Sequence, residues 1–165
     1  MFERTRRQLF THRNQASLPR LPWLKNEAEF TDICSRCERC INICEASILT
    51  KGNGGFPQVD FSRGEKECTF CYQCADVCPK PLFLAQTELP WAITATVNDA
   101  CIATKNIECR SCSDMCESQA IQFHLQVGKV AVPSISISDC VGCGACISVC
   151  PTTAITLHRV EHSIL

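Results

Sequence analysis

Sixteen cysteines in four groups of four constrain this chain of 165 residues more than any other feature of its sequence. Groups one, two and four have the spacing C-x2-C-x2-C-x3-C, and groups two and four are followed by proline. In group three the first gap widens to seven residues. Group one is Cys34, Cys37, Cys40 and Cys44; group two is Cys68, Cys71, Cys74 and Cys78; group three is Cys101, Cys109, Cys112 and Cys116; group four is Cys140, Cys143, Cys146 and Cys150. Any fold for this chain must accommodate thiols at these spacings.

The cysteine groups also reveal an internal duplication. A shift of 72 residues superimposes seven cysteines of groups one and two on seven of groups three and four. The eighth, Cys34, would fall on Asn106, whereas group three begins five residues earlier, at Cys101. The tripeptide 21–23, Leu-Pro-Trp, recurs at 89–91, ahead of the first cysteine of each half. A repeat that keeps the cysteine spacing while the rest changes indicates two copies of one metal-binding unit.

The spacing within each group is typical of iron–sulfur cubes. A loop with cysteines at i, i+3 and i+6 can supply three thiolates to one cube, and in the run C-x2-C-x2-C-x3-C-P the fourth cysteine ligates the neighbouring cluster. The sequence therefore predicts four [4Fe–4S] clusters, with the fourth ligands exchanged within each half. The predicted sets are set one, Cys34, Cys37, Cys40 and Cys78; set two, Cys68, Cys71, Cys74 and Cys44; set three, Cys101, Cys109, Cys112 and Cys150; and set four, Cys140, Cys143, Cys146 and Cys116.

Several alternatives stay open at the level of sequence. Group one could pair with group four and group two with group three, although the duplication favours pairing within a half. Zinc sites also use thiolates, usually as two separated C-x2-C pairs. A disulfide framework needs an oxidising compartment. A [3Fe–4S] cluster would form at set three if Cys101 does not reach its corner.

The remaining composition gives no sign of catalysis, nucleic-acid binding or a membrane span. The net charge is −1, which does not indicate a nucleic-acid partner. No apolar run approaches the roughly 18 residues that span a bilayer. No Ser-His-Asp set, catalytic carboxylate pair or phosphate-binding loop is visible. The four histidines are isolated from one another in the sequence: they are His12, His124, His158 and His162. We therefore expect an electron-transfer or maturation protein rather than an enzyme.

Residues 1–20 form a basic arm. Its charged residues are Arg4, Arg6, Arg7, Arg13 and Arg20 against Glu3. Residues 5–10 look like a twin-arginine export signal, but the following residues are polar and basic where a signal peptide needs an apolar segment. We therefore expect a cytoplasmic protein. The arm is interpreted as a solvated tail, as a surface that docks an acidic partner or associates peripherally with an anionic membrane face, or as a relic of an export signal.

The pattern between the cysteine groups predicts an α+β fold of two tandem ferredoxin-like halves with short hairpins and helices. We expect hairpins within 45–67 and 117–139, one helical turn after each fourth cysteine, and a terminal strand over 155–160. Each half has about 55 residues, too few for a sizeable apolar core, so the clusters themselves should form the centre of the fold. Each repeated tryptophan is expected to pack over its own half. The predicted divisions are an arm over 1–30, a first half over 31–88 and a second half over 89–165.

The four motifs across 34–151 resemble the bacterial polyferredoxin family. The chain length, the Arg6-Arg7 arm, the Leu-Pro-Trp segment and the long gap in group three together resemble the ferredoxin-type accessory proteins of periplasmic nitrate reductase systems. This resemblance implies a cytoplasmic protein with four [4Fe–4S] clusters that contacts the catalytic molybdenum subunit, NapA, before export. It further implies a role in maturation, by assembling or reducing that subunit's own cluster. The alternative is a general electron carrier or the electron-transfer subunit of a multi-subunit oxidoreductase.

Overall fold

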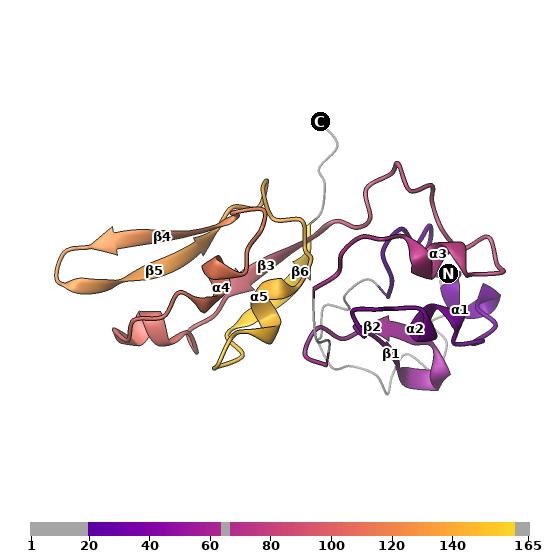
Figure 1. The fold of residues 1–165 in the computed structure, drawn as a ribbon, viewed down its shortest axis with the longest axis horizontal. Coiled ribbons are helices and arrows are strands. Elements are labelled where there is room, and N and C mark those ends of the chain that lie inside the picture. The colour runs from indigo at the N-terminus through magenta and orange to yellow at the C-terminus, as the bar shows by residue number, and fades with distance from the viewer. Residues whose placement is uncertain (1–19, 64–66, 161–165) are drawn as a thin grey trace, which may run out of the picture.

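The computed structural model describes residues 20–63 and 67–160, so almost all of the basic arm lies outside the described residues. The chain forms two lobes side by side, drawn indigo to magenta and magenta to yellow in Figure 1. The first lobe contains α1 (Phe30–Ile33), α2 (Arg39–Asn42), β1 (Leu49–Lys51), η2 (Asn53–Gly55), β2 (Pro57–Val59) and α3 (Gln73–Asp76). The second contains β3 (Ile93–Val97), η3 (Ile102–Lys105), α4 (Ser111–Asp114), β4 (Ile121–Gln126), β5 (Lys129–Ile135), α5 (Ala145–Ser148) and β6 (Ile155–Arg159).

These elements are too short to be stable by themselves. Each α-helix is a single turn of four residues, and each sheet has two strands. Isolated helices shorter than about 12 residues and isolated two-stranded hairpins are marginal in water. The elements therefore depend on whatever they pack around. Within 20–63 and 67–160, no helix has the length and hydropathy required to cross a membrane.

The helical turns do not lie where the sequence predicted them. They precede the fourth cysteine of each group and carry the third: Cys40 is in α2, Cys74 in α3, Cys112 in α4 and Cys146 in α5. The prediction of a helical turn after each fourth cysteine is wrong. In groups one, three and four the physical reason is a backbone reversal three residues after that cysteine, where Ser47, Gln119 and Thr153 have φ values of 54°, 53° and 48°. A residue in the left-handed region ends a right-handed helix.

Both predicted hairpins are confirmed. In the first half β1 pairs antiparallel with β2, with Leu49 opposite Val59. In the second half β4 pairs antiparallel with β5, with Ile121 opposite Ile135 and a register shift near the tip. The turn of this longer hairpin includes Gly128 at φ 74°. In Figure 1 the β4–β5 hairpin extends away from the first lobe.

A third sheet joins the two ends of the second half. The terminal strand predicted over 155–160 is present as β6, which pairs antiparallel with β3 from Ile93 opposite Arg159 to Val97 opposite Ile155. The sequence analysis missed β3, although its residues are mostly β-branched. In the first half the corresponding pairing is a single bridge between Leu24 and Phe83. The second half is therefore closed by a longer sheet than the first.

A small apolar core runs through both halves. Its largest fully buried side chains are Phe30, Leu21 and Ile48, each 2% exposed or less. Two predicted ligands, Cys74 and Cys146, belong to the same buried cluster. The expectation that an apolar core is largely absent was too strong, because residues outside the cysteine groups supply most of these side chains. The core nevertheless surrounds the cysteines rather than standing apart from them.

The two repeated tryptophans have different roles. Trp23 is buried and packs edge-on against Phe70 and Tyr72 of its own half, as predicted. Trp91 packs edge-on against Phe61 and Phe70, which both belong to the first half. The prediction that Trp91 covers the second half is therefore wrong. It lies between the halves, because its ring packs on the first half while its indole N–H donates to the Val141 carbonyl of the second half at 3.2 Å.

Candidate metal centres

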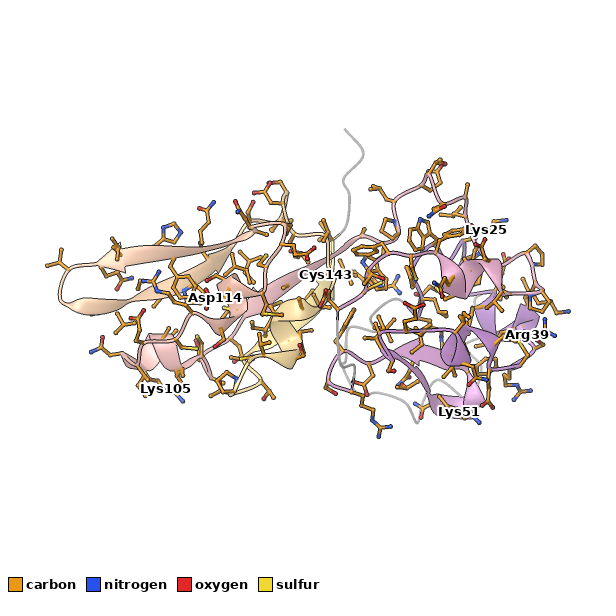
Figure 2. All side chains as sticks on the ribbon, viewed as in Figure 1. Lys25, Arg39, Lys51, Lys105, Asp114 and Cys143 are labelled. Carbon is orange, nitrogen blue, oxygen red and sulfur yellow. The ribbon has the colours of Figure 1, made fainter. Side chains whose placement is uncertain are left out.

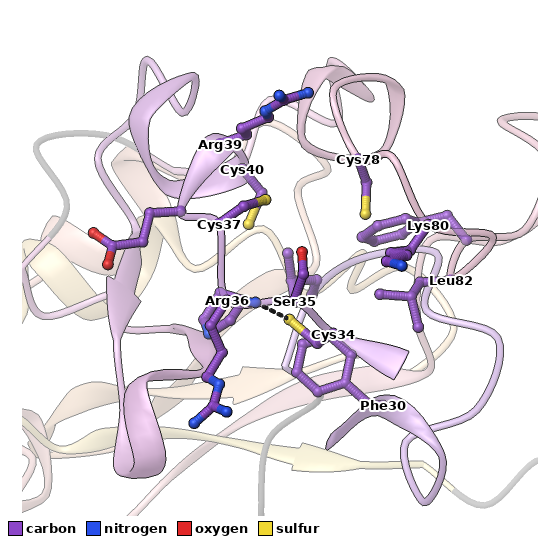
Figure 3. A pocket seen from close by; sticks show the side chains of 14 residues that line it. Phe30, Cys34, Ser35, Arg36, Cys37, Arg39, Cys40, Cys78, Lys80 and Leu82 are labelled. Carbon is purple, nitrogen blue, oxygen red and sulfur yellow. Dashed lines mark hydrogen bonds between the residues drawn. The ribbon is translucent and has the colours of Figure 1, made fainter. Parts of the chain in front are cut away.

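Set one surrounds a cavity in the first lobe. Cys34, Cys37 and Cys40 come from the segment between α1 and the end of α2, and Cys78 follows α3. Figure 3 shows these side chains around the cavity, with Phe30 below it. The fourth cysteine therefore comes from group two, which is the exchange that the spacing predicts.

Sets three and four surround two cavities in the second lobe. The set-three cavity is lined by Cys101, Cys109, Cys112 and Cys150, and the set-four cavity by Cys116, Cys140, Cys143 and Cys146. The sheet of β3 and β6 forms a wall of both. Ala95 and Leu157 face set four, whereas Val97 and Ile155 face set three. The fourth cysteines are again exchanged between neighbouring groups of the same half.

The four thiols of set two also lie within electrostatic reach of one another. Burial raises the pKa of the Cys68 thiol to about 12, and negative charge on Cys44 and Cys71 adds to the rise. Burial likewise raises the pKa of Cys74 to about 12, with further contributions from Cys68, Cys71, Cys40 and Cys44. The influence of Cys40 shows that sets one and two are neighbours. Each set thus draws its cysteines from one half, and Cys143 of the second half lies near enough to raise the pKa of Cys68 as well.

Cys101 reaches its set despite the widened gap in group three. The inserted residues form the turn η3, which begins directly after Cys101. The Cys101 backbone N–H donates to the Asn98 carbonyl at 3.1 Å, and the Cys101 carbonyl accepts a hydrogen bond from the Thr104 hydroxyl at 2.6 Å. The insertion is therefore a compact turn that keeps Cys101 beside the other three cysteines.

Left-handed residues shape the loops of groups one, two and four. They flank the second cysteine of each group and are Arg36 and Glu38, Phe70 and Tyr72, and Gly142 and Gly144. Their φ values lie between 53° and 86°. Alternating left- and right-handed residues turn successive backbone N–H groups toward one concave side, which makes an anion-binding nest. Such loops suit a cluster whose thiolate and sulfide sulfurs carry negative charge.

Several hydrogen-bond donors point at cysteine sulfurs. The backbone N–H of Arg36 donates to Cys34 Sγ at 3.4 Å, as Figure 3 shows, and the backbone N–H of Ala154 lies 3.2 Å from Cys150 Sγ. In the second half, three cysteines are each followed two residues later by a serine or threonine. The hydroxyl of that residue lies 3.5 to 3.8 Å from the cysteine sulfur: Ser111 beside Cys109, Ser118 beside Cys116 and Thr152 beside Cys150. Donors to cluster sulfurs stabilise negative charge and thereby tune the reduction potential.

Burial keeps many of the thiols protonated in the protein without metal. It raises the pKa of Cys40 to about 11 and that of Cys146 to about 12. The exposed Cys37 is the opposite case, because the backbone N–H of Arg39 and the hydroxyl of Ser35 lower its pKa. A buried thiol gives up its proton only when a positive charge such as iron replaces it.

The donors present fit [4Fe–4S] clusters. All sixteen cysteines are free thiols, and soft thiolate ligands select iron–sulfur clusters among other metal centres. Within 20–63 and 67–160, no three Cys, His, Asp or Glu side chains converge closely enough to hold a single ion. The four thiols of each lined cavity instead stand around it, with apolar side chains between them.

The set-one cavity differs from those of sets three and four in its charge. Its lining includes Arg36, Arg39 and Lys80, together with Glu38, which forms an ion pair with Lys51 at 2.5 Å. Among the described residues, the linings of the set-three and set-four cavities contain no charged side chain. The protein environment therefore favours negative charge more strongly at set one than at the sets of the second half.

The sequence analysis singled out the cysteines and missed the residues that tune and connect them. Ser111, Ser118 and Thr152 each follow a cysteine by two residues, and this C-x-[Ser/Thr] pattern is visible in the sequence. Small residues in a cluster loop let the backbone approach a cube, and group four has glycine at positions 142 and 144. In the structure a Cβ at Gly142 would lie 2.4 Å from Ile93, and one at Gly144 would lie 2.1 Å from Phe61. Packing against protein side chains thus also requires glycine here.

The fold and these cysteine sets define a tandem dicluster ferredoxin. A family model described as a 4Fe-4S dicluster domain matches residues 33–82, and a second with the same description matches residues 105–154. Two dicluster domains imply [4Fe–4S] clusters, two for each domain, and ferredoxin-type proteins of this class carry electrons.

Among curated proteins, the chain is similar to the ferredoxin-type protein NapF of Escherichia coli K12, with 42% identity over 142 residues, which covers 86% of this chain and 85% of that protein. It is 42% identical over 144 residues to the ferredoxin-type protein NapF of Haemophilus influenzae, which covers 87% and 81% of the two chains. A methylamine utilization ferredoxin-type protein, MauM of Methylophilus methylotrophus, is 28% identical over 147 residues. The chain belongs to the NapF family of ferredoxin-type proteins.

Proposed function

We propose that this protein binds four [4Fe–4S] clusters on sets one to four and serves the catalytic subunit of the periplasmic nitrate reductase, NapA, before that subunit is exported. The observation that carries the proposal is the grouping of the sixteen thiols into four sets, in a chain 42% identical to NapF proteins. The proposed role is to supply electrons to that subunit or to assemble its cluster. Such a role places the protein in the cytoplasm, where thiols stay reduced.

The chain's own residues hold, shield and tune the clusters. Cluster binding supplies one-electron redox chemistry near a protein surface. The thiols fix each cluster, while apolar residues such as Phe30 and Ile121 limit the access of water to the cavities. Backbone N–H groups, hydroxyls and the cations of set one then set how readily each site accepts negative charge. Each of these contributions belongs to residues that the structure describes.

The basic arm is proposed to contact the partner. Its composition of five arginines against one glutamate supports docking to an acidic protein surface or peripheral association with an anionic membrane face. The arm ends at Arg20, directly before Leu21, which lines the set-one cavity. A partner held by the arm would therefore be held near the first half of the protein.

Anaerobic purification combined with partner capture tests this function. Four cubes correspond to about sixteen irons and sixteen sulfides per chain. The loaded protein is then incubated with NapA that retains its export signal, and with mature NapA as the control. We expect capture of the precursor, and a loss of at least about tenfold in affinity when residues 1–19 are removed at unchanged iron content. A fully loaded protein that binds neither form contradicts the NapA assignment.

A general electron carrier is the second candidate. It is favoured by the hydrogen bond from the Cys68 backbone N–H to the Cys143 carbonyl, which joins the two halves and suits electron transfer through the whole molecule. A carrier should reduce and oxidise small redox dyes and unrelated partners equally well with and without residues 1–19. A maturation factor should lose only its specific partner. Dye reduction and precursor capture, measured on the same two proteins, therefore distinguish the two functions.

A further inference from the structure

The two halves meet through the cysteine loops of groups two and four. The backbone N–H of Cys68 donates to the backbone carbonyl of Cys143 at 2.8 Å. Each residue belongs to a different half, and each is a predicted ligand of its own set. Figure 2 labels Cys143 at the boundary between the lobes. A hydrogen bond between the two ligand-bearing backbones brings sets two and four close together.

Tight packing supports the same contact. A Cβ added to Gly144 would lie 2.1 Å from the ring of Phe61, which is 4% exposed. The rings of Phe61 and Phe70 lie 6.0 Å and 5.9 Å from that of Trp91, centroid to centroid. The Trp91 indole N–H donates to the Val141 carbonyl at 3.2 Å. Three aromatic rings and the group-four loop thus form one interface.

An ion pair joins the halves at a second place. The Glu27 carboxylate, ahead of α1, lies 2.7 Å from the Arg159 guanidinium at the end of β6. Because both side chains are partly exposed, this pair contributes little to stability and mainly fixes orientation. Together with the aromatic contact, it indicates that the lobes have one preferred arrangement.

The β3 strand then places set three beyond set four. Ile93, at the start of β3, lies against Gly142 in the group-four loop. Ala95 lines the set-four cavity and Val97 the set-three cavity. Since a strand rises about 3.3 Å per residue, the four steps from Ile93 to Val97 correspond to about 13 Å. Along β3, set four therefore lies nearer to the junction and set three lies farther from it.

We propose that sets two and four form the junction between the halves, so that the four sets follow one another in space in the order one, two, four, three. This order differs from their order in the sequence, in which group three follows group two. The inference deepens the proposed function and rests on it, because it concerns the clusters that the sets would hold. Sets one and three are then the two ends, one bordered by cations and one by uncharged side chains.

Magnetic coupling between reduced clusters tests this order. Replacing Cys34 and Cys37 by alanine removes two ligands of set one, so that neither a four-iron nor a three-iron cluster forms beside set two. The pair Cys140→Ala and Cys143→Ala, or the pair Cys109→Ala and Cys112→Ala, is then added to remove set four or set three. Iron is counted in every variant, and electron paramagnetic resonance is recorded after full reduction. We expect the broadening of the set-two signal to disappear when set four is removed and to persist when set three is removed. The reverse pattern, or an unbroadened signal in the fully loaded protein, would overturn the order.

Hydrogen exchange on the loaded protein gives a second test that leaves every ligand in place. Phe61→Ala removes an aromatic ring at the junction. Phe56→Ala is the control, because the Phe56 ring lies in the same hairpin but packs on Phe30 and not at the junction. We expect Phe61→Ala to accelerate exchange at least about tenfold in both 67–71 and 140–144, and Phe56→Ala to leave 140–144 unchanged. Acceleration confined to the first half contradicts the junction. A wild-type protein that fails to load iron contradicts the proposed function instead.

Discussion

The contact between Gly144 and Phe61 allows us to predict how much the Gly144→Ala substitution destabilises the protein. Gly144 has a φ of 86°, and an added Cβ would lie 2.1 Å from the Phe61 ring. The left-handed backbone costs a residue with a Cβ about 1–2 kcal/mol, and overpacking a buried site costs about 1–3 kcal/mol more. We therefore expect a destabilisation of about 2–5 kcal/mol in total.

Gly128→Ala is the matched control for this prediction. Gly128 has a φ of 74°, but no atom lies within 4 Å of a Cβ placed there. It should therefore show only the backbone cost of about 1–2 kcal/mol. The difference between the two variants isolates the clash, and about 1–3 kcal/mol corresponds to a difference of roughly 5- to 150-fold in the unfolding equilibrium.

The assay follows the loss of cluster absorbance in guanidinium chloride under anaerobic conditions, at matched starting iron content. Because cluster loss is irreversible, the unfolding rate is the quantity to compare, and the equilibrium factor given above is the upper limit of the difference in rate. Gly144→Ala should lose its clusters faster than Gly128→Ala, and adding Phe61→Leu should recover part of the difference, because neighbouring substitutions are not additive. Equal rates for the two alanine variants would refute the reasoning, since the packing of Phe61 on the group-four loop would then be absent.

Three further predictions concern the cysteine sets. Replacing Arg39 and Lys80 by glutamine should lower the reduction potential at set one in a spectroelectrochemical titration. Removing two positive charges at about 10 Å corresponds to a decrease of about 30–140 mV. An unchanged potential contradicts the charge argument. Burial raises the pKa of Cys146 to about 12 without metal, so cluster binding releases its proton and should weaken as pH falls, measured as iron retained between pH 8.5 and 6. Cys101→Ser should affect the set-three signal alone, and loss of all clusters would contradict its assignment.

The sequence predicted the features that short-range constraints determine. The cysteine spacings within each group fix which thiols a loop can present, and the 72-residue repeat favours pairing within a half. Alternation of apolar residues around Gly128 similarly indicated the hairpin of β4 and β5. These signals lie within a few residues of one another, so no tertiary information is needed to read them.

The features that the sequence analysis missed depend on contacts between distant residues. Strand β3 pairs with β6 about 60 residues further along the chain, where no local turn signal connects them. Trp91 contacts the first half because of how the lobes pack, although its repeat position suggested otherwise. The helical turns were misplaced because Ser47, Gln119 and Thr153 are non-glycine residues in the left-handed region, which composition does not reveal.

Native mass spectrometry of the anaerobically purified protein tests the central claim most directly, because it reports intact mass and cofactor load together. The account predicts a dominant species whose mass exceeds that of the polypeptide by four [4Fe–4S] clusters, with every cysteine reduced. A dominant species that carries zinc, or one whose mass shows paired cysteines and no iron, would contradict it.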